Sequence, residues 1–165
     1  MHVQSFYTLE NDYTCRTCPK CESQAGLTIE KQYYKQMNTE DINKLTHKII
    51  GCAMEVHNQM GNGFQEVVYQ RALSIELNMN HLEHQRELEM PLEYKGYNVG
   101  TRRVDFFVEG NVMVEIKAIE KIEGVHKAQA INYCEAYNIA DGLLINFGAE
   151  RLQYHRVFNK KLKNS

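Results

Sequence analysis

The sequence predicts one α/β domain in which a mixed sheet of four to five strands is flanked by helices. Two helical patterns come first along the chain, a run of strand patterns follows, and another helix and two strands complete the order. Hydrophobic residues make up 43% of the 165 residues, enough for one domain with a sizeable core. Residues 1–38 show no sustained periodicity, so we interpret them as an N-terminal extension of uncertain order and predict the domain at 39–165.

Two helices are expected at the start of this domain. The first begins with an N-cap at Thr39 and ends at Gly61, which takes the C′ position. Its apolar residues recur at helical spacing and are Ile42, Leu45, Ile49, Ala53, Val56 and Met60. The second helix runs from Phe64 to about Met79. Its predicted apolar stripe consists of Val68, Ala72, Ile75 and Met79, and a neighbouring stripe carries Glu66 and Tyr69.

Strand patterns begin after Leu82. One strand is predicted from Glu83 to Tyr94, where the interruption by Pro91 indicates an edge strand or a bulge. A turn at Lys95-Gly96 leads to a short strand, Tyr97 to Val99, and then to a hairpin. The remaining predicted elements are a helix from Gly124 to about Asn138 and strands at Leu143 to Phe147 and Leu152 to Phe158.

The hairpin RRVDFFVEGNVMVEIKA, residues 102–118, is the most informative segment because apolar residues alternate along both arms. A three-residue loop, 109–111, would place Asp105 directly opposite Glu115, with Cβ atoms about 4.5–5.5 Å apart. A two-residue Gly110-Asn111 turn is favoured by turn chemistry, but it would oppose Asp105 to Ile116 and mix the two faces. The hydrophobic pattern therefore selects the first register, and Lys117 then projects from the same face as Glu115.

Two carboxylates held this close repel each other unless a cation, a proton or a strong partner offsets their charge. Oxygen ligands without a His or Cys cluster favour Mg²⁺ or Mn²⁺ over Zn²⁺. The chemistry predicted for the hairpin is metal-assisted hydrolysis of a phosphodiester. The competing interpretation is an ordinary solvated hairpin face.

The formal net charge of −2 does not by itself indicate a nucleic-acid-binding protein, although it can hide a local basic patch. Candidate phosphate contacts are Arg102, Arg103, Lys117, Lys121, Lys127, Lys160, Lys161 and Lys163. No apolar run is long enough to cross a bilayer, and the first residues lack the pattern of a secretory signal, so the expected compartment is the cytoplasm.

Three of the five cysteines form a C-x₂-C-x₂-C cluster at Cys15, Cys18 and Cys21. This spacing suits zinc or part of an iron–sulfur cluster, but a closed tetrahedral site needs a fourth ligand, for which His2 is the only nearby candidate. Cys52 and Cys134 fall within predicted helices, where we expect small core residues.

Two further motifs point to a known family. The stretch Gly63-x-x-Glu66-x-x-Tyr69 resembles the GxxExxY family of small bacterial proteins. The hairpin's Asp105-x₉-Glu115-x-Lys117 is similar to the core motif of the PD-(D/E)xK nuclease superfamily, to which the GxxExxY family is assigned.

The resemblance extends to the C-terminal part of the chain. Gln129-x-x-x-Tyr133 is like the Q-x-x-x-Y motif of exonuclease-type members, and GLLINFG, residues 142–148, is a further match. The matching region covers about Thr39 to Phe158. The proline of "PD" is replaced by Val104, and the cysteine cluster lies outside the resemblance.

The resemblance implies a restriction-endonuclease-like fold with the acidic hairpin at the centre of the sheet. It also implies that Asp105 and Glu115 bind a metal, with the carbonyl of Ile116 as a further ligand and Glu66 completing the site directly or through a water. Lys117 would orient or deprotonate the attacking water and offset charge on the phosphorus.

The substrate-positioning residues predicted beside these are Gln129, Tyr133, Tyr69 and Arg103. The leading functional hypothesis is an Mg²⁺- or Mn²⁺-dependent nuclease in which a metal-activated water hydrolyses nucleic acid. One alternative is a non-catalytic nuclease-fold protein that binds or regulates, with a protein partner. Another is a zinc-binding adaptor that acts through the N-terminal cysteines. The sequence leaves open whether the substrate is DNA or RNA, and the oligomeric state.

Overall fold

The fold is described from a computed structural model, which covers residues 37–162. Its elements are α2 (Thr39–Met60), α3 (Glu66–Met79), β1 (His84–Tyr94), β2 (Tyr97–Val108), β3 (Val112–Lys117), α4 (Gly124–Ala136), β4 (Asp141–Asn146) and β5 (Gln153–Phe158). The extension with its cysteine cluster lies outside the described residues. No helix within 37–162 is both long enough and apolar enough to span a membrane.

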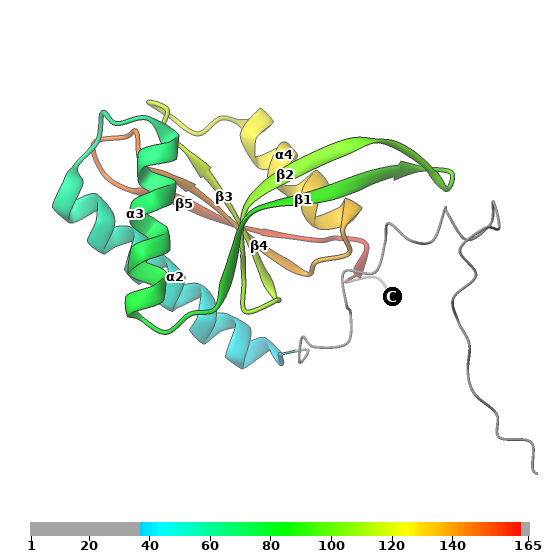
Figure 1. The fold of residues 1–165 in the computed structure, drawn as a ribbon, viewed down its shortest axis with the longest axis horizontal. Coiled ribbons are helices and arrows are strands. Elements are labelled where there is room, and N and C mark those ends of the chain that lie inside the picture. Colours follow the sequence, from blue (N-terminus) through cyan, green and yellow to red (C-terminus); the bar gives the residue numbers. More distant parts are fainter. Residues whose placement is uncertain (1–36, 163–165) are drawn as a thin grey trace, which may run out of the picture. The chain divides into compact units, whose positions relative to one another are not determined.

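The five strands form one mixed sheet in the order β1-β2-β3-β4-β5. Only β3 and β4 pair in parallel, and the other neighbours are antiparallel. Helices α2 and α3 cover one face of this sheet and α4 covers the other (Figure 1). The predicted mixed sheet flanked by helices is therefore confirmed.

Strand β3 lies at the centre of the sheet and is buried on both faces. Val114 and Ile116 pack in the core beneath α2 and α3, whereas Met113 packs in the core beneath α4. Glu115, on the α4 side, is only 6% exposed. The interpretation of this segment as a solvated hairpin face is wrong, because α4 covers the face that carries Glu115.

The helices differ from the prediction in two details. The N-cap of α2 is Asn38, one residue before the predicted Thr39, because the Asn38 side chain accepts a hydrogen bond from the Asp41 N–H at 2.9 Å. The apolar stripe predicted for α3 was wrong, since Ile75 and Met79 are 61% and 69% exposed. The buried side of α3 instead carries Tyr69, Gln70, Leu73 and Leu77.

Strands β1 and β2 are each continuous, so the predicted break before the hairpin is absent. Gly100, where the break was expected, has a φ of 151° within an unbroken β2. Pro91 lies on β1 opposite Thr101, and β1 is the edge strand, as expected for a strand proline. Figure 1 shows the outer part of β1 and β2 extending away from the rest of the sheet.

The β2–β3 hairpin has the register that the hydrophobic pattern selects. Val108 pairs with Val112 and Phe106 with Val114, leaving the three-residue loop 109–111. The Asn111 N–H donates to the Val108 carbonyl at 3.0 Å and closes this loop. The register places Asp105 and Glu115 at the same level of the sheet.

Candidate active site

The candidate site lies where β2 and β3 separate. Their ladder ends at the pair Phe106 and Val114, so Asp105 and Glu115 are not the directly opposed ladder pair that was predicted. Instead, Oδ2 of Asp105 accepts a hydrogen bond from the Ile116 N–H at 2.7 Å. In a regular ladder a backbone carbonyl of β2 would accept this hydrogen bond. Here the Asp105 carboxylate accepts it instead, and the two strands are held apart.

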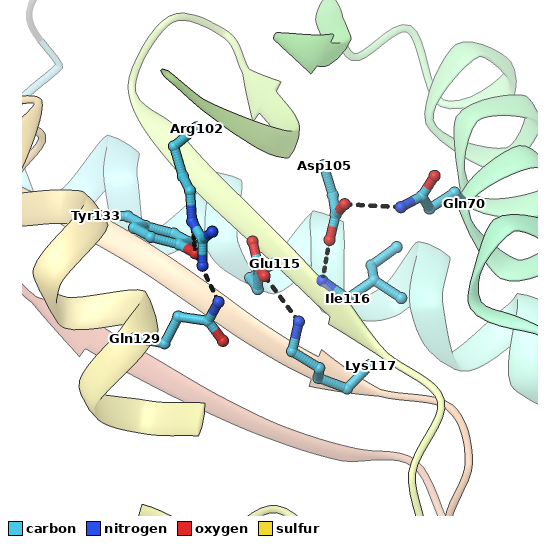
Figure 2. Close-up of polar contacts among 8 residues, drawn as sticks. All are labelled: Gln70, Arg102, Asp105, Glu115, Ile116, Lys117, Gln129 and Tyr133. Carbon is cyan, nitrogen blue, oxygen red and sulfur yellow. Dashed lines mark hydrogen bonds and ion pairs between the residues drawn. The ribbon is translucent and has the colours of Figure 1, made fainter. Parts of the chain in front are cut away.

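The side-chain alternation of β2 also shifts at Asp105. Phe106 packs beneath α2 and α3, but Val104 packs beneath α4, although strict alternation predicts the same face for both. On the neighbouring β1, Glu87 sits at this level with a φ of 54°, a local irregularity of the kind that re-aims a side chain. Asp105 can therefore reach α3, where its Oδ1 accepts a hydrogen bond from Gln70 Nε2 at 2.7 Å (Figure 2).

Glu115 provides the second carboxylate. Its Oε1 accepts a hydrogen bond from Lys117 Nζ at 2.7 Å, and both side chains are largely shielded from solvent. Within residues 37–162, the buried Oε2 of Glu115 has no hydrogen-bond partner. Leaving a buried carboxylate oxygen unpaired is costly, and a bound cation is one way to satisfy it.

The two carboxylates and the lysine influence one another strongly. Burial, followed by the charge of Glu115, raises the pKa of Asp105 to about 6. Burial also raises the pKa of Glu115, although the hydrogen bond from Lys117 opposes this. Burial acts to lower the pKa of Lys117, but the Glu115 hydrogen bond and the nearby carboxylates together raise it. Lys117 is therefore held in its charged form.

Glu66, the first residue of α3, lies at the margin of this group. Burial raises its pKa, and the charges of Lys117 and Asp105 act on it in opposite directions, so it is electrostatically coupled to the site. In the described part of the chain, no three His, Cys, Asp or Glu side chains are grouped closely enough to hold a metal ion. The pair Asp105 and Glu115 fits a cation, because of the unpaired Oε2.

A second cluster lies beside Glu115, on the side of α4. The Tyr133 hydroxyl accepts hydrogen bonds from Gln129 Nε2, at 2.6 Å, and from Arg102 Nε. The Arg102 guanidinium lies over the Tyr133 ring, 5.0 Å from its centroid. Arg102 also acts to lower the pKa of Glu115, so this cluster faces the carboxylates (Figure 2).

The prediction that Arg103 positions substrate stays a prediction, because this residue lies on the exposed outer part of β2. It is 63% exposed and forms a 3.7 Å ion pair with Glu87, although its charge still acts to lower the pKa of Asp105. Arg102 was predicted only as one of many phosphate contacts, and Gln70 was missed entirely. A signal for Gln70 was present, since it stands four residues after Glu66, one turn along the same helix.

Tyr69 has a structural position rather than the predicted contact with substrate. It is fully buried, and its ring stacks on Phe147 with centroids 4.7 Å apart. Its hydroxyl donates to the Gly61 carbonyl at 2.8 Å and accepts from the Phe64 N–H at 3.2 Å. Tyr69 therefore fixes the turn between α2 and α3 and so the start of α3, where Glu66 lies.

The GLLINFG segment holds the end of β3 in place. The Phe147 N–H donates to the Lys117 carbonyl at 2.8 Å. The fully buried Asn146 side chain binds both the N–H and the carbonyl of Ile119, at 3.0 and 2.8 Å, and accepts from the Gly148 N–H at 3.0 Å. A Cβ on Gly148 would lie 2.4 Å from the Ile119 nitrogen, so only glycine permits this approach.

A mixed sheet between helices, with two crowded carboxylates where its inner strands separate and a lysine two residues later, defines a restriction-endonuclease-like α/β protein. The chain belongs to the PD-(D/E)XK nuclease superfamily, whose family model matches residues 43–157.

Among solved structures, the crystal structure of SSO0001 matches with a TM-score of 0.45 and 19% identity, over 56% of this chain and 50% of that one. The chain thus covers about half the length of that protein. Comparison with curated proteins gave no match.

Proposed function

We propose that this protein is a nuclease that uses Mg²⁺ or Mn²⁺ to hydrolyse phosphodiester bonds in nucleic acid. The observation that carries the proposal is the buried, unpaired Oε2 of Glu115 close to Asp105, whose pKa is raised to about 6. The fold provides no hydrogen bond for this oxygen within the described residues, and a cation would satisfy it. Two carboxylates without a His or Cys partner favour a hard divalent cation. Membership of the nuclease superfamily supports the same conclusion.

Asp105 and Glu115 are the proposed metal-binding residues, with the Ile116 carbonyl as a main-chain ligand and Glu66 acting through a water. When bound, a divalent cation supplies positive charge that polarises the phosphate and makes a water more acidic. Gln70 fixes the orientation of Asp105 by donating to Oδ1, while the Ile116 N–H binds Oδ2. Such outer contacts hold a ligand in a productive position.

Lys117 acts as a point charge in this proposal. The hydrogen bond to Glu115 and the nearby carboxylates raise its pKa, so it is protonated in the metal-free protein. Its ammonium group donates to Glu115 in this structure and would donate to a phosphate oxygen when substrate is present. Charge that develops on the phosphate in the transition state is stabilised by such a fixed cation.

Arg102 is proposed to clamp the phosphate from the other side. Its Nε donates to Tyr133, which aims the guanidinium without using the two terminal nitrogens. Gln129 binds the same hydroxyl and holds Tyr133 in place. A planar guanidinium can bind two phosphate oxygens at once, so Arg102 would orient the scissile group.

We also propose that the chain belongs, within the superfamily, to the GxxExxY group. Gly63 has a φ of 103°, which suits the tight turn before α3. Tyr69 fixes the same turn through its hydroxyl, and Glu66 lies between them at the start of α3. Gly63 and Tyr69 thus both help to form the turn that positions the start of α3.

The proposal is tested by metal binding and cleavage in the full chain. Mg²⁺ and Mn²⁺ are titrated calorimetrically into the wild type, the double variant Asp105→Asn with Glu115→Gln, and Glu40→Gln as a control. Glu40 is 78% exposed and forms an ion pair with Lys44 on the same helix. Each protein is then incubated with single- and double-stranded DNA and RNA.

We expect the wild type and Glu40→Gln to bind metal and cleave at least one substrate, and the double variant to do neither. Cleavage that survives in the double variant would overturn the assignment of the site. Metal binding by the wild type without cleavage of any substrate would instead establish a non-catalytic binding protein.

A further inference from the structure

The outer part of the β1–β2 hairpin, residues 91–103, forms an arm whose β2 strand is exposed on both faces. All seven residues of β2 from 97 to 103 are exposed, in contrast to the buried inner part of the same strand. The arm carries Lys95, Arg102 and Arg103 and one acid, Glu93, in a chain whose formal net charge is −2. At its base, Arg103 lies opposite Glu89 and forms a 3.7 Å ion pair with Glu87, so Lys95 is the cation that the tip itself presents.

Two tyrosines occupy the tip of the arm. Tyr94 and Tyr97 pair directly across the two strands, so their side chains share one face. They are 63% and 77% exposed, and Lys95 Nζ lies 5.4 Å from the centroid of the Tyr94 ring. Large aromatic rings this exposed have no role in the core of the protein. Paired rings beside a cation are the combination on which unpaired nucleobases stack.

The arm is joined directly to the candidate active site. Strand β2 is unbroken from Tyr97 at the tip to Asp105, a separation of eight residues or roughly 26 Å at about 3.3 Å per residue. Arg102 and Arg103 lie near the inner end of this path, and Arg102 contacts Tyr133 in the site. Positive charge is thus present at both ends of the path.

We propose that the arm binds single-stranded nucleic acid, with bases stacked on Tyr94 and Tyr97 and phosphates held by Lys95 and Arg103. This inference rests on the proposed nuclease function and names the form of its substrate. A single strand fits the tip because its bases are free to stack on protein rings, whereas the faces of paired bases are covered by their neighbours in a duplex.

The test is fluorescence anisotropy with labelled dT₂₀, rU₂₀ and a duplex of the same length, measured in EDTA so that no metal-dependent cleavage occurs. The full chain is compared with Tyr94→Ala plus Tyr97→Ala. Tyr154→Ala is the matched control, because Tyr154 is an exposed tyrosine, at 42%, on β5. The double variant with phenylalanine at 94 and 97 retains both rings, and circular dichroism checks that every variant is folded.

Loss of one stacking ring is worth about 5- to 150-fold in affinity. We therefore expect the double alanine variant to bind at least about tenfold more weakly, and the phenylalanine variant and Tyr154→Ala to bind within about twofold of the wild type. Lys95→Ala should reduce the slope of log affinity against log salt by about 0.7. The dT₂₀ and rU₂₀ arms of the experiment separate DNA from RNA.

Three results would overturn the proposal: unchanged affinity in the double alanine variant, equal weakening by Tyr154→Ala, or duplex binding that depends on the two rings as strongly. If sedimentation shows that the wild type is a dimer and that only the Tyr94→Ala plus Tyr97→Ala variant is a monomer, the arm instead binds a second copy of the chain. Binding that depends on the two rings, without cleavage of any substrate, would support the arm as a binding site and reject the nuclease activity. Metal-dependent cleavage, with binding that does not depend on the rings, would support the nuclease activity and reject the arm as a binding site.

Discussion

Replacing Asp105 by Asn should make the metal-free protein more stable at neutral pH. Burial and the charge of Glu115 raise the pKa of Asp105 from its ordinary value of 3.8 to about 6. The folded state therefore holds the proton more tightly than the unfolded state does. Ionisation of Asp105 lowers the free energy of unfolding as the pH rises above about 4, and this loss is complete once the pH is well above 6.

The size of the effect follows from the two pKa values. Each pH unit between them is worth about 1.4 kcal/mol, so ionised Asp105 lowers the free energy of unfolding by about 3 kcal/mol at pH 7.5. Asn keeps an acceptor for the Ile116 N–H, but Gln70 must turn its amide to face the new NH₂ group. Allowing about 1 kcal/mol for the weakened hydrogen bonds, we expect Asp105→Asn to gain about 2 kcal/mol.

The assay is urea unfolding in EDTA, followed by circular dichroism, at pH 7.5 and pH 4. The gain should disappear at pH 4, where Asp105 is neutral in the folded wild type and only about half ionised in the unfolded chain, so that most of the ionisation penalty is gone. Asp141→Asn is the matched control, because Arg156 donates two hydrogen bonds to Asp141 Oδ1 at 2.9 and 2.6 Å. This control should lose about 1–3 kcal/mol, the opposite sign.

Divalent metal should reverse the order of stability of the two proteins. Metal that binds only the folded wild type adds about 2.7 kcal/mol at a concentration one hundred times its Kd, whereas Asp105→Asn should gain little. If Asp105→Asn is less stable than the wild type at pH 7.5 without metal, then the hydrogen bonds of Asp105 outweigh its buried charge. The argument that the fold holds an uncompensated carboxylate for a cation would then fail.

The other predictions concern the packing that presents the site, and urea or thermal unfolding measures each of them. Leu73→Ala should cost 2–5 kcal/mol because the side chain is fully buried, while Ile75→Ser, at 61% exposure, should change stability by less than about 0.5 kcal/mol; similar losses would contradict the observed face of α3. Asn146→Ala should cost at least about 3 kcal/mol because it leaves buried groups of Ile119 and Gly148 unpaired, and a loss below about 1 kcal/mol would show that water replaces the amide. Gly148→Ala should lower the Tm by several degrees, since its Cβ meets the Ile119 backbone at 2.4 Å, and an unchanged Tm would show that this approach is not tight.

The order of elements and the hairpin register could be predicted because both depend on local patterns. Alternation of apolar residues fixes which face a strand residue takes. Shifting the pairing of β2 and β3 by one residue, so that Asp105 opposed Ile116, would have moved core residues to the solvent face. The buried face of α3 could not be predicted in the same way. Its true stripe includes Gln70, which is buried because it binds Asp105, while the exposed Ile75 and Met79 mimic a core stripe.

The parts of the site that the sequence did not reveal involve residues far apart in the chain. Gln70 meets Asp105 across 35 positions, and Arg102 meets Tyr133 across 31. These contacts depend on where α3 and α4 cross the sheet, and the spacing of apolar residues within a helix or strand does not determine that position. The separation of β2 from β3 at Asp105 is similar, because it depends on the hydrogen bond between the Ile116 N–H and the Asp105 side chain rather than on a local pattern.

The charges gathered at the site explain why a cation and a phosphate would be expected to bind together. Glu66, Asp105 and Glu115 place three carboxylates against two cations, Lys117 and Arg102, so the ionised site carries an excess of one negative charge. A phosphodiester is repelled by that excess. One divalent cation reverses its sign, which turns repulsion into attraction for the substrate. Affinity for nucleic acid at the carboxylates should therefore depend on metal, whereas affinity at the basic arm should not.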